Sequence, residues 1–73
     1  MAELVRTNNH GIVAVIESLL QEADIRYHVA DRNISVIEGS IGAFPMRVLV
    51  SDDAEEEARE LLTDADLGEW LRP

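Results

Sequence analysis

The chain has 73 residues, a formal net charge of −9 and no cysteine. We expect one domain over residues 1–73, with a core from 3 to 66, a C-terminal tail from 67 to 73 and no disulfide. Its six cationic residues are all arginines, outnumbered by 15 acids, so a nucleic-acid backbone is disfavoured as a partner. The sequence has neither an apolar run of about 20 residues nor a signal peptide, which predicts no membrane association and a cytoplasmic location.

The small size of the chain bears on its oligomeric state. A domain of this length buries only about 60% of the surface that its unfolded form exposes. Small domains often gain further stability by oligomerising. We therefore expect self-association, as a homodimer or a higher homo-oligomer.

Residues 7–24 carry the clearest periodic pattern and are predicted to form an amphipathic helix. Asn8 and Asn9 are good N-caps for it, and Asp24 marks its end in a left-handed conformation that aspartate tolerates better than most residues. Apolar residues recur at helical spacing and are expected to face inward: Ile12, Val15, Ile16, Leu19, Leu20 and Ala23.

Three short segments with alternating apolar and polar residues predict strands at 3–7, 25–30 and 46–50. Residues 31–45, which contain Gly39, Gly42 and Pro45, read as a long hairpin loop between the second and third strands.

A second helix is predicted to open at Asp52 or Asp53, each followed three residues later by a glutamate in a capping-box pattern. Gly68 is expected to end the helical structure. The tail then carries Trp70, which either folds back onto the domain, the reading that we favour, or anchors a partner.

The predicted order β-α-β-β-α defines an α+β fold of the ferredoxin-like, split β-α-β type. A right-handed crossover between the first two strands leaves room for the third strand between them, antiparallel to both. Two helices then cover one face of a three-stranded sheet. The first strand lies at an edge, where the tail or another subunit should cover its unpaired backbone groups.

Strand alternation predicts a cluster of positive charge on the open face of the sheet. Arg47 on the central strand is expected to be flanked by Arg6 and Arg26, and like charges on neighbouring strands repel unless an anion lies among them. Leu4 and Leu49 are expected on the same face. We hypothesise an acidic partner there, which could be the glutamate-rich second helix of another subunit, a different protein or a small anionic effector. The simpler interpretation, which we favour, is that these arginines extend into solvent.

The loop at 31–45 is a second candidate site, because long loops in small domains are often functional. Arg32, Asn33, Gly39 and Gly42 are its candidate ligand contacts. In this alternative the protein is a small-molecule effector sensor whose loop closes over a ligand at the sheet edge. The glycine spacing is not a phosphate-binding fingerprint, and a mobile hairpin tip is the simpler reading.

Catalytic equipment is not recognisable in the sequence. His10 and His28 lack metal-ligand spacing, and no serine stands in an order with histidine and acid that predicts a nucleophile. The acids of 52–60 point in different directions around a helix and read as a solvated surface. We expect a protein without enzymatic activity, metal or cofactor.

Several segments resemble a family of small bacterial proteins assigned to signal transduction and formerly known as a domain of unknown function. The segments are ELVRTNN at the start, ESLLQEADI at the end of the first helix, Gly39, PMRVLV from Pro45, and DAEEEARELL from Asp53. The family is grouped structurally with PII-like (GlnB-like) ferredoxin-fold regulators. This resemblance implies an oligomeric regulator that binds partners or small effectors, and it assigns no role to a particular residue.

Overall fold

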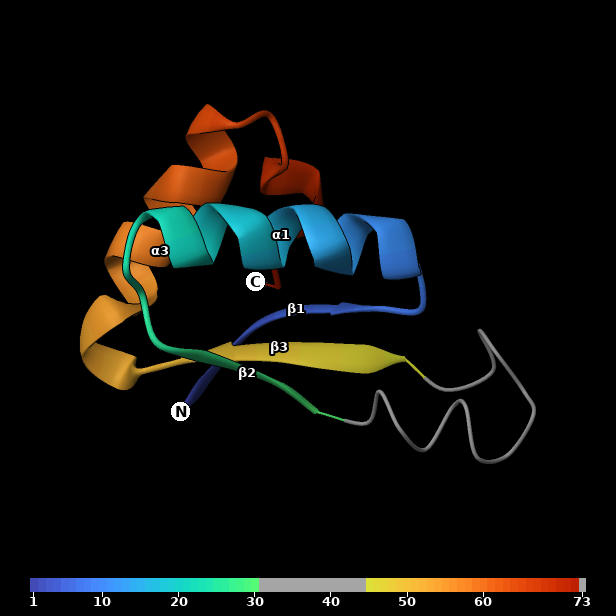
Figure 1. Cartoon of the computed structure of the whole chain (residues 1–73), viewed down its shortest axis with the longest axis horizontal. Helices are drawn as coiled ribbons and strands as arrows, with labels where there is room; N and C mark the ends of the chain where they lie inside the picture. The colour runs from blue at the N-terminus through green and yellow to red at the C-terminus, as the bar shows by residue number, and fades with distance from the viewer. Residues whose placement is uncertain (31–44, 73) are drawn as a thin grey trace.

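The computed structural model describes residues 1–30 and 45–72, and their order is β-α-β-β-α as predicted. The elements are β1 (Ala2–Thr7), α1 (His10–Glu22), β2 (Tyr27–Ala30), β3 (Met46–Val50), the 3-10 turn η1 (Asp52–Ala54), α3 (Glu55–Asp64) and the 3-10 turn η2 (Gly68–Trp70). The sheet order is β1-β3-β2, and β3 pairs antiparallel with both neighbours. Helices α1 and α3 lie on one side of this sheet (Figure 1). The predicted α+β fold with a central third strand is confirmed.

A β-bulge in β1 decides which of its side chains enter the core. Ala2 and Glu3 pair with Val50 and Leu49, but the next paired residue is Val5, opposite Val48, so Leu4 is the extra residue. In a regular strand, consecutive side chains point to opposite faces. Leu4 and Val5 are consecutive and both fully buried. The prediction that Leu4 lies on the open face was therefore wrong, because the bulge shifts the alternation by one residue.

The start of α1 follows the predicted cap. The Asn9 side-chain Oδ1 accepts a hydrogen bond of 3.1 Å from the Ile12 amide. The helix is rotated differently from the prediction: Val13, Ile16 and Leu20 are its buried residues, whereas Val15 is 49% exposed. Two apolar stripes run along α1, and only one of them can be centred over the sheet. Val15 belongs to the other.

Helices α1 and α3 end in the same left-handed turn, formed by an aspartate. Asp24 follows α1 with φ 59°, and Asp66 follows α3 with φ 66°. After each of them an apolar residue donates its amide hydrogen back into the last helical turn, Ile25 to the Leu20 carbonyl at 2.9 Å and Leu67 to the Leu62 carbonyl at 2.8 Å. These are Schellman motifs, in which glycine is the commonest left-handed residue.

We expect Asp24→Gly and Asp66→Gly each to raise the free energy of unfolding by about 1 kcal/mol. Glycine adopts the left-handed conformation without the Cβ penalty, and its introduction removes a negative charge from the negative end of a helix dipole. Urea unfolding followed by circular dichroism would measure the change. Ala14→Gly, at an exposed position inside α1, is the control and should have the opposite sign, with a loss of about 1 kcal/mol. A loss at Asp24 or Asp66 would contradict this account.

The second helix starts later and ends earlier than predicted. Asp52 and Asp53 lie in η1, and α3 begins at Glu55 with Ala54 as its N-cap residue, without a side-chain capping bond. The expected capping box is therefore not formed. Helix α3 ends at Asp64 rather than at Gly68, which opens η2 instead. Ala58 and Leu62 are its buried residues.

Candidate functional site

The open face of the sheet brings Arg6 and Arg47 directly opposite each other. They are paired residues of the antiparallel β1 and β3 strands, on the face that the helices do not cover. Further along this face, Leu49 of β3 lies between Glu3 of β1 and His28 of β2. Arg6 and His28 are exposed, and Arg47 and Leu49 are partly buried. This part of the predicted cluster is present, and two guanidinium groups lie on adjacent strands in a strongly acidic chain.

Arg26 does not belong to this cluster. The residue of β2 that pairs with Arg47 is Ala30, whereas Arg26 precedes β2 at the other end of the strand. Four strand residues span roughly 13 Å, which places Arg26 outside the reach of an anion held at Arg47. Arg26 lines an open depression together with Asp53 and Glu57. The predicted flanking of Arg47 from both sides was wrong because strand register cannot be read from alternation alone.

Glu3 provides an internal carboxylate for the open face. Its Oε1 accepts a hydrogen bond of 2.9 Å from Arg6 Nε, and its Oε2 accepts one of 3.4 Å from Arg6 Nη2. Residues three apart in a regular strand would point to opposite faces, and the bulge at Leu4 brings Glu3 and Arg6 to the same one. The pairing is the bidentate form in which a guanidinium recognises a carboxylate.

The C-terminal tail lies along the free edge of β1. Leu71 forms an antiparallel bridge with Val5, and the Arg72 amide donates a hydrogen bond of 2.9 Å to the Leu4 carbonyl. The sequence left two possibilities for covering this edge, the tail or another subunit. In the structure the tail covers it. The bulged residue thus has its side chain in the core and its carbonyl bonded to the tail.

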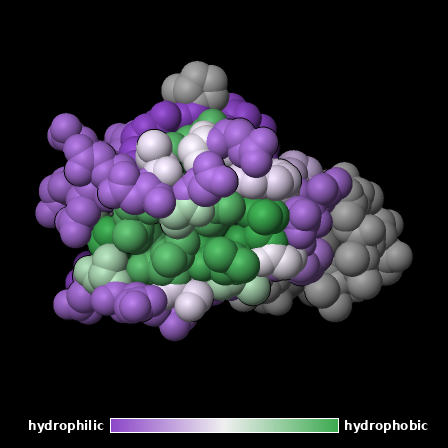
Figure 2. Space-filling model, turned by 90° about the horizontal axis from the view of Figure 1, so that it is seen from above, coloured by the Kyte–Doolittle hydropathy of each residue, from purple (hydrophilic) through white to green (hydrophobic). Residues whose placement is uncertain are grey.

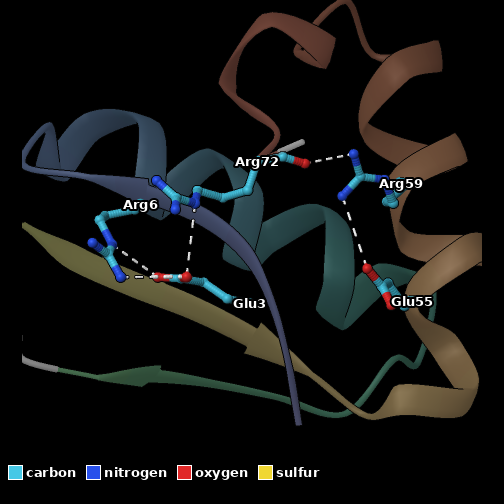
Figure 3. A network of polar contacts seen from close by, with 5 residues as sticks. All are labelled: Glu3, Arg6, Glu55, Arg59 and Arg72. Atoms are coloured by element: carbon cyan, nitrogen blue, oxygen red, sulfur yellow. Dashed lines mark hydrogen bonds and ion pairs between the residues drawn. The ribbon is translucent and has the colours of Figure 1, made fainter.

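Arginine side chains tie this tail to both neighbouring elements (Figure 3). Arg72 Nε lies 3.7 Å from Oε2 of Glu3 on β1. Arg59 of α3 donates a hydrogen bond of 2.6 Å to the Arg72 carbonyl and also lies 3.9 Å from Glu55. The pairing of Arg59 with Glu55 follows from their i, i+4 spacing on a helix. Glu3 and Arg72 could not be predicted as partners, because they are far apart in the sequence and meet only in the folded chain.

Trp70 folds back onto the domain, the reading favoured from the sequence. It is partly buried and packs with Leu67 and Leu71 against the hydrophobic core. The other predicted contacts, Arg32, Asn33, Gly39 and Gly42, lie outside the described residues, as does all of the 31–45 loop except Pro45.

Within 1–30 and 45–72, histidine and acidic side chains form no group of three that could hold a metal ion. None of the helices described is long and apolar enough to cross a membrane.

A family model described as "Putative prokaryotic signal transducing protein" matches residues 1–66. The chain belongs to this family. No curated protein matches it. The family match stops before Leu67, so the tail segment that contacts β1 lies beyond the part of the chain that the family model covers. The grouping with PII-like regulators stays a prediction.

Proposed function

We propose that this member of the signal-transducing family is a non-enzymatic regulatory domain that binds the carboxylate or phosphate groups of a partner protein or a small effector through the open face of its sheet. The observation that carries this proposal is the placement of Arg6 directly opposite Arg47. Like charges opposite each other across two strands repel, and an anion beside them reduces that repulsion, as the Glu3 carboxylate already does at Arg6.

The ion pair of Glu3 with Arg6 supports the proposal by showing the geometry of such recognition within the chain. A carboxylate already approaches this face and contacts the Arg6 guanidinium through both of its oxygens. The same carboxylate also lies near Arg72, so Glu3 is shared between two cations. An incoming anion would compete with Glu3 for Arg6 and would also be attracted by the charge of the nearby Arg47.

Titration of the full chain with inorganic phosphate and with an oligoglutamate peptide, followed by NMR chemical shifts of backbone amides, tests this function. We expect the Arg6, Arg47 and Leu49 amides to shift. Arg47→Ala should weaken binding about tenfold, the equivalent of one charge-assisted hydrogen bond of about 1.4 kcal/mol.

Two further variants sharpen the test. Arg26→Ala makes the same charge change outside the cluster and should leave binding within about twofold of the unmodified chain, the effect of a screened distant charge. Glu3→Gln removes the internal competitor and should tighten binding. Equal effects of Arg47→Ala and Arg26→Ala, or weaker binding by Glu3→Gln, would contradict an anion site on this face.

A further inference from the structure

The helical side of the molecule carries an apolar surface that the fold does not use. Helix α1 buries Val13, Ile16 and Leu20 against the sheet. A second apolar stripe, offset around the same helix, consists of Ile12, Val15, Leu19 and Ala23, with successive spacings of 3, 4 and 4 residues. Together with Leu61 of α3 we call these residues the outer strip. Val15 is 49% exposed, and the other four pack only partly against the core.

The outer strip is continuous and slightly hollowed. Figure 2 shows a hydrophobic band across the helical layer, seen from above and bordered by hydrophilic side chains. A shallow groove of about 290 Å³ lies between the two helices and is lined by Leu19, Ala23, Leu61 and Glu22. A hydrophobic groove of this kind is a surface into which an amphipathic helix can lay its apolar face.

The charges around the outer strip define what can cover it. Glu22 lines the groove, and Glu57 and Asp64, four residues before and three after Leu61, share its face of α3 and are exposed. Arg59 is the only arginine in α1 and α3, and it contacts Glu55 and the tail carbonyl of Arg72. Arg26 shares a depression with Glu57 beside the C-terminal end of α1, so acids outnumber cations around the rim of the strip.

This rim selects among possible occupants. Two copies that docked through their outer strips would bring Glu22, Glu57 and Asp64 against an equally acidic rim, and nucleic acid or an anionic membrane would be repelled for the same reason. A cationic partner would instead place lysine or arginine beside these acids while its apolar residues cover the strip.

We propose that the outer strip is a docking groove for a basic amphipathic helix of a partner protein. Apolar residues of that helix at positions i, i+3 or i+4, and i+7 contact Ile12, Val15 and Leu19, and its flanking cations pair with the acidic rim. This surface lies on the opposite side of the domain from Arg6 and Arg47 and has the opposite charge. The docking groove is independent of the anion site proposed above, so an experiment can contradict either proposal and leave the other standing.

The test uses the full chain and three fluorescein-labelled peptides in anisotropy titrations. One peptide has leucines at helical spacing and lysines elsewhere, the second has the same composition in scrambled order, and the third carries glutamates in place of the lysines. We expect the first to bind more tightly than the other two, and its affinity to fall when salt is raised from about 0.1 M to about 1 M, which shortens the Debye length from about 10 Å to about 3 Å.

Matched variants locate the contact. Val15→Gln removes an apolar contact from the outer strip without changing charge and should weaken binding of the first peptide about fivefold to tenfold. Ala14→Gln makes a similar change at an exposed α1 position away from the strip and should change affinity less than twofold, as expected of a surface substitution outside the contact. Glu22→Gln should reduce both the affinity and its salt dependence.

Three outcomes would overturn the proposal. The first is that the scrambled or the glutamate peptide binds as tightly as the first peptide. The second is that Ala14→Gln weakens binding as much as Val15→Gln. The third is that the unmodified chain self-associates in sedimentation experiments and that Val15→Gln abolishes this association, which would make a second copy of the chain the occupant.

Discussion

Leu4→Ala is expected to lower the free energy of unfolding by about 2–5 kcal/mol, the usual cost of truncating a buried leucine. Domains of this kind have only about 5–15 kcal/mol of stability in total, so a chain at the low end of that range would retain about 0–3 kcal/mol, and up to half of the variant would be unfolded. Leu4 is fully buried, among the largest of the fully buried side chains, and belongs to the same core cluster as Ile16 and Leu62.

The matched control is Leu49→Ala. Leu49 is the same residue type in the adjacent strand, and strict alternation would have placed both leucines on the open face. The structure places only Leu49 there, partly exposed. Its truncation should cost about 1 kcal/mol or less. Urea unfolding of both variants, monitored by circular dichroism, compares them directly, and equal losses would show that β1 runs without the bulge.

Removal of residues 67–73 should lower stability by about 3 kcal/mol, because three partly buried apolar side chains lose their packing. These are Leu67, Trp70 and Leu71. The truncation also removes the Leu67 amide that closes the end of α3 and uncovers the β1 edge at Leu4 and Val5. Open sheet edges pair with other chains, so we expect concentration-dependent self-association in sedimentation velocity experiments.

A point variant tests the same edge without the loss of packing. Arg72→Pro removes the amide hydrogen that Arg72 donates to the Leu4 carbonyl. Leu71, with φ −71° and ψ 142°, already has a backbone conformation that accepts a following proline. Arg72→Ala loses the side chain but keeps the amide. We expect the proline variant to be less stable than the alanine variant by about 1 kcal/mol, the net contribution of one hydrogen bond.

Two results would contradict the role of the tail, one from the point variants and one from the truncated chain. If Arg72→Pro and Arg72→Ala unfold at the same urea concentration, the backbone bond to Leu4 contributes nothing. If the truncated chain stays monomeric at high concentration while remaining folded, the tail is not what keeps the β1 edge from pairing.

Much of the architecture followed from local sequence. The helical pattern of 7–24, the cap at Asn9, the left-handed end at Asp24 and the central position of β3 were all predicted and are present. Each depends on residues close together in the chain or on a general rule of strand connection, so neighbouring residues contain the necessary information.

The candidate site was only partly predictable. Alternation was sufficient to place Arg6 and Arg47 on the same face, but the pairing of Arg47 with Ala30 rather than a position near Arg26 depends on strand register. Register is fixed by how whole strands align and by the connection between them, and a single strand's pattern is compatible with several alignments.

What the sequence by itself determined is therefore the order of elements and the ends of α1, because periodicity and capping act within a few residues. Tertiary structure alone decided that Leu4 enters the core, that Val13 rather than Val15 faces the sheet, and that Leu71 and Arg72 cover the edge of β1. A bulge, a helix rotation and an edge contact each depend on atoms contributed by distant parts of the chain. Local patterns of period 2 or 3.6 leave those choices open, and packing settles them.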